Sequence, residues 1–210
     1  MRKLESPTLA GSHVRLEPLA RDHAHGLLEA ANAARATYAF TFVPSSLTGM
    51  EAYVTAALAE QDRGESVPFV VRDASGAIVG TTRFMDIQHF RWLTDPPAPV
   101  PVGPDAVEIG STWYAERVQR TALNTEAKLL LGSHAFDTWR VRRITWKTDA
   151  RNLRSRTAIE RLGARFDGVL RAHMAASDGT VRSTAYYSML AAEWPEAQRA
   201  LVQRLDRRRD

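Results

Sequence analysis

The spacing of hydrophobic and polar positions along the chain changes repeatedly between the periods typical of strands and of helices. Alternation over two residues predicts strands at residues 13–19, 67–72, 77–87, 107–114, 143–148, 164–172 and 182–190. Apolar residues three and four apart predict helices at residues 22–34, 48–64, 124–136 and 152–162, and from 195 towards the end. The order is therefore strand, two helices, three strands, helix, strand, helix, two strands and a last helix.

Capping and turn residues mark the boundaries of these elements. Asp22 is a candidate N-cap for the first helix, and Thr48 with Glu51 predicts a capping box at the second. The turn at 177–180 indicates a hairpin between the last two strands. Residues 89–106 form a long loop with half of all the prolines, which cannot continue a strand ladder or a helix at this density. A loop of this length is usually functional or mobile.

The composition is that of a folded domain. The chain has 210 residues, of which 44% are hydrophobic and 25% charged, and this excludes disorder for most of its length. No internal repeat and no linker divides it. We therefore predict one domain over residues 1–210, with a core at about 10–190 and a C-terminal helix and basic tail at 191–210. The mixed order of elements predicts an α/β (α+β) fold.

Several classes of protein are excluded or disfavoured. The chain has no cysteine, so a disulfide scaffold, a thiolate metal site and a cysteine nucleophile are excluded. The six histidines show no metal-ligand spacing, and we expect no metal. No stretch is apolar enough to span a membrane, and the N-terminus has no hydrophobic signal region. A cytoplasmic protein with no membrane partner is the expectation.

The positive charge is concentrated in one part of the chain. The net charge is only +4, but residues 140–171 hold ten Lys and Arg against three Asp and Glu. A local basic stretch in a nearly neutral protein indicates one anionic partner at one place. A nucleic-acid binder is the least favoured interpretation, because the chain lacks a basic motif interleaved with aromatics and a helix-turn-helix pattern.

The most informative stretch joins the strand at 107–114 to the helix at 124–136. A strand followed by a turn of small residues and then by a helix places free backbone N–H groups at the helix start. Together with the positive end of the helix dipole, these N–H groups form an anion site suited to a pyrophosphate.

Four segments together carry a resemblance to a known family. They are HVRLEPL at 13–19, VEIG at 107–110, NTEAKLLL at 124–131, and Asn152-x-x-Ser155 with Leu162-Gly163. On these the chain resembles the GCN5-related N-acetyltransferase (GNAT) superfamily, of the ribosomal-protein N-acetyltransferase (RimJ/RimL-like) type. The resemblance implies a mixed, mostly antiparallel central sheet of about seven strands flanked by helices. It also implies transfer of an acetyl group from the cosubstrate acetyl-CoA to an amine.

The cofactor-binding residues follow from this resemblance. The family turn is usually Gln/Arg-x-x-Gly-x-Gly/Ala, and here Ala122 replaces the central glycine. We still expect this turn to bind the CoA diphosphate through Gln119, Arg120, Thr121, Ala122, Leu123 and Asn124. Trp113 and Tyr114 belong to the strand that would offer backbone groups to pantetheine. Asn152 would bind pantetheine or its neighbouring backbone. One or two of the arginines that flank Asn152 would bind the CoA phosphates. These arginines are Arg151, Arg154 and Arg156, and we predict that Arg156 binds CoA.

The catalytic residues are less regular. Many relatives place a tyrosine acid seven residues after the asparagine, but this chain has Ile159 there. Ser155 is the remaining hydroxyl and the candidate acid, with a backward bond to a helix carbonyl as the alternative. Glu108 is the candidate base, acting directly or through water, with pairing to an arginine or exposure to solvent as the alternatives. Glu126 is expected to favour the dipole at the helix start.

The acceptor remains open at this stage. A protein N-terminus and a small amine are both compatible, and succinyl transfer is an alternative to acetyl transfer. A CoA-binding module without catalysis is the alternative of another class. The sequence does not determine the oligomeric state, and a homodimer is one of the states it allows. Six aromatic residues are candidates for an acceptor pocket or for the core: Tyr38, Phe40, Phe42, Phe84, Phe90 and Trp92.

Overall fold

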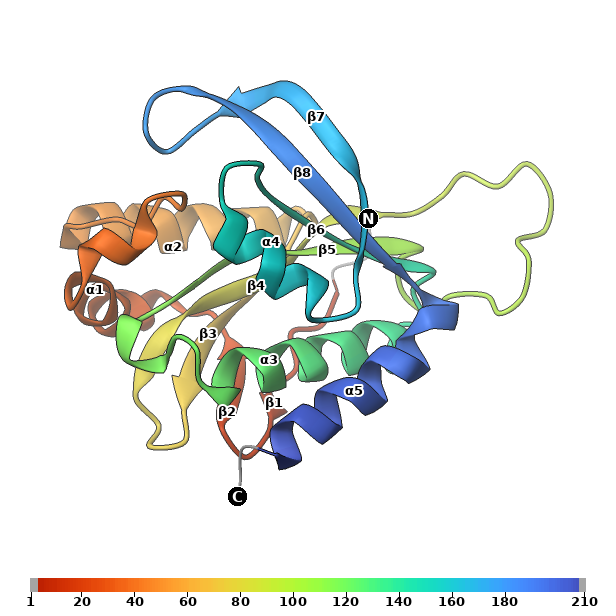
Figure 1. Ribbon diagram of the computed structural model, residues 1–210, viewed down its shortest axis with the longest axis horizontal. Coiled ribbons are helices and arrows are strands. Elements are labelled where there is room, and N and C mark those ends of the chain that lie inside the picture. Colours follow the sequence, from red (N-terminus) through yellow and green to blue (C-terminus); the bar gives the residue numbers. More distant parts are fainter. Residues whose placement is uncertain (1–3, 208–210) are drawn as a thin grey trace.

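One twisted sheet forms the centre of the molecule (Figure 1). The computed structural model describes residues 4–207. The strand order is β1-β2-β3-β4-β5-β6-β8-β7, and every neighbouring pair is antiparallel except β5–β6. The strands are β1 (Leu9–Ala10), β2 (Val14–Pro18), β3 (Val67–Asp73), β4 (Ile78–Gln88), β5 (Ala106–Tyr114), β6 (Arg143–Asp149), β7 (Arg165–Ala175) and β8 (Val181–Leu190).

Helices cover the two faces of this sheet unequally. They are α1 (Ala24–Asn32), α2 (Leu47–Asp62), α3 (Ala122–Ser133), α4 (Leu153–Glu160) and α5 (Trp194–Asp206). Successive strand residues point to opposite faces, so Phe69 and Val71 pack in one apolar cluster with α3 and α5, whereas Val70 packs in another with α1 and α2. The β7–β8 hairpin rises away from both helix layers (Figure 1).

The fold prediction is confirmed in its mixed, mostly antiparallel sheet and its flanking helices. The sheet has eight strands, where about seven were expected, because the short β1 adds two residue pairs beside β2. The long loop after β4 has no regular structure and projects from the domain (Figure 1). Arg208 and Arg209, which belong to the predicted basic tail, lie outside the described residues.

Two predicted helix starts are wrong. The N-cap of α2 is Ser46, whose hydroxyl accepts a hydrogen bond from the Gly49 N–H at 3.2 Å, so Thr48 lies inside the helix and forms no capping box. At α1 a 3-10 turn over Arg21–His23 precedes the helix, and Asp22 lies within that turn and does not cap α1. Ser46 and Thr48 both have a side-chain oxygen that can cap α2, and the sequence pattern alone does not show which of them does.

Glu126 has a different role from the one expected. Its carboxylate accepts hydrogen bonds from the backbone N–H groups of Ser12, His13 and Val14 at 2.6–2.9 Å. A Cβ on Gly11 would approach the Glu126 carboxyl carbon to 2.3 Å, so a larger residue there would displace the carboxylate from these hydrogen bonds. Glu126 therefore anchors the entry to β2 on α3 and is not placed to act on the helix dipole.

The β5–β6 pair positions the site. Its parallel register covers only Ala106–Glu108 against Arg143–Thr145, after which the two strands separate. Beyond Glu108, β5 pairs only with β4, and β6 pairs only with β8. We call the resulting opening between residues 109–114 and 146–149 the wedge. Because the strands are parallel, the connections to α3 and α4 both begin at the wide end of the wedge.

Candidate active site

Two β-bulges lie on either side of Glu108. The β4–β5 register shifts between Thr81 and Arg83, opposite Ser111, and again between Met85 and Gln88, beside Asp86. Ser111 and Asp86 both have a φ of +47°. Left-handed backbone at residues other than glycine is strained and concentrates at functional sites, and bulges redirect strands beside them. The backbone of β5 is therefore irregular at the narrow end of the wedge.

The predicted CoA turn begins α3. Thr121 is the N-cap, with its hydroxyl accepting a hydrogen bond from the Leu123 N–H at 3.3 Å and donating one to the Val118 carbonyl at 2.7 Å. Arg120 has a φ of +62°, which directs the chain from a 3-10 turn into the helix. The Gln119 amide donates to the Tyr114 carbonyl at 2.9 Å and fastens the turn to the end of β5.

These contacts orient the first turn of α3 towards the wedge. The first N–H groups of an α-helix have no partner within the helix, and the positive end of the dipole lies there. The Leu123 side chain is buried in the core, so only its backbone can meet a ligand. Ala122 and Asn124 are partly exposed. The turn 119–124 therefore has the geometry of an anion site.

Asn152 and Ser155 begin α4 at the same end of the wedge. Asn152 is the N-cap, and its side-chain oxygen accepts a hydrogen bond from the Ser155 N–H at 3.0 Å. Over the described residues the Ser155 hydroxyl forms no hydrogen bond, so the backward bond to a helix carbonyl is not made. The position of the missing tyrosine, Ile159, is buried in the core.

The arginines beside Asn152 point in different directions. Arg154 donates to the Gln119 side-chain oxygen at 3.2 Å and so connects α4 with the CoA turn. Arg156 donates instead to the Tyr187 hydroxyl at 2.9 Å and lies over the Phe166 ring, 5.3 Å from its centroid. The structure therefore brings Arg154, and not Arg156, to the predicted diphosphate site. The assignment of Arg156 to CoA stays a prediction.

Trp113 and Tyr114 are buried on opposite faces of β5. Trp113 meets the Tyr38 ring edge to face, with centroids 5.8 Å apart, and the Tyr38 hydroxyl donates to the Tyr114 carbonyl at 3.2 Å. Burial raises the pKa of Tyr114 far above its usual value. Both side chains are therefore buried in the core, and only the backbone of these two residues could meet a ligand.

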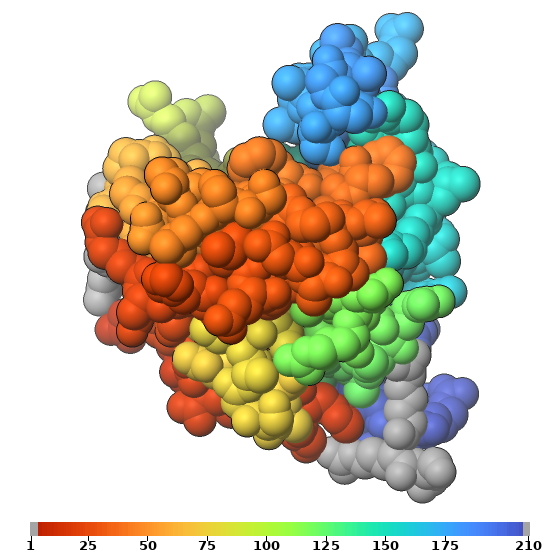
Figure 2. All heavy atoms as spheres, turned by 90° about the vertical axis from the view of Figure 1, so that its left-hand side faces the viewer, coloured from red at the N-terminus to blue at the C-terminus, as the bar shows by residue number. Residues whose placement is uncertain are grey.

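Segments far apart in the sequence meet near the wide end of the wedge, where Figure 2 shows the orange region against the teal α4 region and the blue hairpin. The segment between α1 and α2 contacts α4 and the β7–β8 hairpin. Arg154 donates to the Thr37 carbonyl at 3.4 Å, the Ser177 hydroxyl donates to the Ala39 carbonyl at 3.1 Å, and Arg151 lies 5.6 Å from the centroid of the Phe40 ring. The turn 119–124 lies next to this junction.

Glu108 is buried and paired with a lysine, which was not foreseen. The Lys147 Nζ lies 2.7 Å from its Oε2 and 3.3 Å from the Asp86 Oδ2. Burial raises the pKa of Glu108, and Lys147 opposes this shift only in part. Burial lowers the pKa of Lys147, but the ion pair with Glu108 outweighs it, and the pKa is raised. The pair is therefore a buried carboxylate held beside a fixed positive charge.

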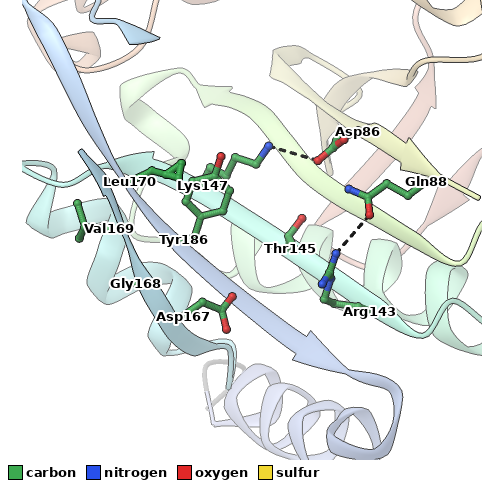
Figure 3. A pocket seen from close by; sticks show the side chains of 10 residues that line it. All are labelled: Asp86, Gln88, Arg143, Thr145, Lys147, Asp167, Gly168, Val169, Leu170 and Tyr186. Carbon is green, nitrogen blue, oxygen red and sulfur yellow. Dashed lines mark hydrogen bonds and ion pairs between the residues drawn. The ribbon is translucent and has the colours of Figure 1, made fainter. Parts of the chain in front are cut away.

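A groove of about 350 Å³ opens beside this pair (Figure 3). Its floor is β6, where Arg143, Thr145 and Lys147 alternate and share one face, and its walls come from the end of β4 and from β7 and β8. None of the six aromatic candidates lines the groove. Phe84 is in the core, and Phe90 and Trp92 contact each other on the long loop, 6.0 Å apart. A shared aromatic pocket is therefore not formed.

Comparison with known proteins identifies the family. Residues 13–165 match the family model described as an acetyltransferase (GNAT) domain. The chain is also 32% identical to a GCN5-related N-acetyltransferase from Brucella melitensis, over 97% of this chain and 87% of that one, with a TM-score of 0.81. This chain belongs to the GNAT acetyltransferase family, in its RimJ/RimL-type branch. Among curated proteins no match is found.

More distant structures share the GNAT fold. Mycobacterium smegmatis RimJ, solved in complex with CoA-disulfide, is 20% identical, with a TM-score of 0.78 and 95% of each chain covered. The microcin C7 self-immunity acetyltransferase MccE, solved in complex with acetyl-CoA and AMP, is 16% identical, with a TM-score of 0.71, covering 86% of this chain and 93% of that one. Across residues 4–207, no helix could cross a membrane and no cluster of residues could hold a metal ion.

The sequence analysis of this GNAT protein missed two lysines. Lys147 forms the ion pair with Glu108, and Lys128 is buried on α3 below the β5 bulge. The Lys128 Nζ donates to the Thr112 hydroxyl at 2.8 Å and lies 3.4 Å from the Thr82 hydroxyl. Burial lowers the pKa of Lys128 to about 7. Nothing in the run AKLLL distinguishes this buried lysine from an exposed one.

We predict that Lys128 makes stability depend on pH. An amine with a lower pKa in the native than in the unfolded state binds fewer protons when native, so the free energy of unfolding rises between about pH 7 and about pH 10. Below pH 7 the full cost of the buried charge is present. Relative to Lys128→Met, the wild type should gain up to about 1.4 kcal/mol per pH unit in this range.

Urea unfolding at pH 6.5, 7.5, 8.5 and 9.5 measures this difference. Gln203→Met, at an exposed position on α5, is the matched control and should leave the pH slope unchanged. Parallel stability curves for wild type and Lys128→Met would show that Lys128 does not titrate in this range.

Proposed function

We propose that this GNAT protein is an N-acetyltransferase that transfers the acetyl group of acetyl-CoA to a primary amine by direct attack within a ternary complex. The observation that carries the proposal is the wedge. It joins a helix start at its wide end, the turn 119–124, to a buried ion-paired carboxylate, Glu108, at its narrow end. The acceptor is a protein N-terminus or a small amine.

The residues of the wedge fit the proposed cosubstrate. The N–H groups at the start of α3 would hold the diphosphate, with Arg120 and Arg154 adding positive charge. The edge of β5 that faces away from β4 is unpaired beyond Glu108 and would bind the amides of pantetheine. Near Ser111, a backbone N–H would polarise the thioester carbonyl. Acetyl-CoA supplies an activated acyl group whose leaving thiol needs little help.

Glu108 is the proposed general base. The attacking amine must be neutral, which costs little for an α-amine, with a pKa of about 7.7–8.0, and more for a lysine, with a pKa of about 10.4. Burial makes the Glu108 carboxylate more basic than an exposed one, while Lys147 keeps it ionised. Glu108 would accept the amine proton directly or through one water.

Ser155 is the proposed acid. Its hydroxyl forms no hydrogen bond with the described residues and lies one turn from Asn152 at the wide end of the wedge. A serine is a weak acid, but a thiol has a pKa of about 8.5 and leaves readily as a thiolate. A modest contribution from Ser155 is therefore sufficient.

A thermal-shift titration with acetyl-CoA, followed by a free-thiol release assay over a panel of amines, tests the function. We expect stabilisation by acetyl-CoA and thiol release with at least one α-amine. Stabilisation without thiol release on any amine would favour a binding module. Faster thiol release from succinyl-CoA than from acetyl-CoA would show that the transferred acyl group is succinyl.

Glu108→Gln should lower kcat/KM at pH 7 by about tenfold to a hundredfold. The acid limb of the pH–rate profile should move upward, because the acceptor must then lose its proton unaided. Asp22→Asn, at an exposed position, is the control and should leave the profile in place. An unchanged profile in Glu108→Gln would remove this residue as the base.

Ser155→Ala should lower kcat by about tenfold while the Kd of acetyl-CoA changes less than twofold, because the hydroxyl acts on the leaving group. Stopped-flow thiol release and calorimetric titration measure the two quantities. Thr157→Ala, at an exposed position on α4, serves as control. Turnover equal to wild type in Ser155→Ala contradicts the acid role.

A further inference from the structure

Arg143 is an incompletely paired cation in the groove. Its Nη2 donates to the Gln88 side-chain oxygen at 3.3 Å, and its Nε is buried with no hydrogen-bond partner. A guanidinium has five N–H groups, and the described chain uses one of them. A partly buried guanidinium without a carboxylate is costly unless an anion completes it.

Two other enclosed arginines pair with carboxylates, whereas Arg182 donates only to the Thr184 hydroxyl, at 2.9 Å. Arg142, the neighbouring residue, pairs with Asp105 at 3.2 Å and donates to the Pro97 carbonyl at 2.7 Å. Arg83 pairs with Glu60 at 2.7 Å. No carboxylate among residues 4–207 lies within 4 Å of Arg143. Arg143 differs from Arg142 and Arg83 in that its partners within the described chain are incomplete, and an anion in the groove would complete them.

The other charged groups of the groove are a lysine in ion pairs and an aspartate bound to a neutral hydroxyl. Lys147 is paired with both Glu108 and Asp86. Asp167, on the β7 wall, accepts a hydrogen bond from the Ser188 hydroxyl at 2.8 Å and forms no ion pair with Arg143. Figure 3 shows Arg143 at the end of the β6 floor away from Lys147. Arg143 is thus the cation of the groove that is available to an anion.

The register of the strands fixes how far this cation lies from the chemistry. Glu108 is level with Thr145 in the parallel pair, and Arg143 is two residues further back along β6. At about 3.3 Å per residue this separation is about 7 Å along the strand. A molecule that reaches Glu108 with its amine therefore places Arg143 beside a group two or three peptide residues away.

We propose that the groove selects an acidic, peptide-like acceptor: a primary amine that carries a carboxylate two to three residues from the amine, with the carboxylate bound by Arg143. The inference rests on the proposed function, because it takes the groove as the acceptor site. An arginine binds a carboxylate through two parallel hydrogen bonds, which also fixes the orientation of the acceptor. Arg143 is then a specificity-determining residue.

Binding of product peptides tests the inference without turnover. Calorimetry on the CoA-saturated protein compares acetyl-Ala-Ala-Glu-amide with acetyl-Ala-Ala-Gln-amide, which differ only in charge. We expect the Glu peptide to bind at least tenfold more tightly to wild type. Arg143→Gln should abolish this preference, and Arg143→Lys should restore part of it. Arg91→Gln, at an exposed position on the long loop, should retain it in full.

Acetylation of the free peptides Ala-Ala-Glu-amide and Ala-Ala-Gln-amide gives the second readout. We expect a lower KM for the Glu peptide and a similar kcat for both peptides. Equal affinity of the two product peptides for wild type overturns the inference, as does a preference that persists in Arg143→Gln. Absence of thiol release with every amine contradicts the proposed function instead, so the two failures are distinguishable.

Discussion

The separation of β5 from β6 after three residue pairs is the constraint on which the rest of the molecule depends. A parallel pair inside an antiparallel sheet requires a crossover, and α3 supplies it. The carboxyl ends of both strands then lie at one edge, so the helices that follow them also start there. Because the strands diverge, one edge of β5 has no neighbouring strand beyond Glu108 inside the domain, and side chains bind only part of its backbone, as at the Tyr114 carbonyl. A buried strand edge of this kind is stable only if a ligand or water completes it.

The narrow end of the wedge concentrates charge and strain. Lys147 links the buried Glu108 to the exposed Asp86, and the two bulges beside these residues carry left-handed backbone at Asp86 and Ser111. Such backbone persists only where the surrounding structure holds it. Lys128 contributes from below through Thr112 and Thr82. An ion network and a rigid bulge together keep the carboxylate in one position, which a proton acceptor requires.

Local sequence patterns predicted most of the elements and the turn that begins α3, but missed β1 and misplaced two helix starts. The alternation at 107–114 and the small residues after it predicted a strand, an anion-binding turn and a helix, because these depend on neighbours along the chain. Lys147 and Arg143 were not predicted, since their roles depend on which strand lies beside β6 and in which register. Glu126 was misjudged for the same reason, because its partners at Ser12, His13 and Val14 are more than 110 residues away. The sequence pattern correctly placed Asn152 at the start of α4, but it did not predict the directions in which the Arg154 and Arg156 side chains point.

The anchoring of the first strands by Glu126 has a consequence for biosynthesis. Val14 leaves the ribosome 112 residues before the carboxylate that holds its N–H. Contacts of such long sequence separation form late, because chain closure must occur before they contribute. The nascent amino-terminal segment therefore stays undocked until the crossover helix has emerged. The entry to β2 and the turn 119–124 therefore depend on the same helix.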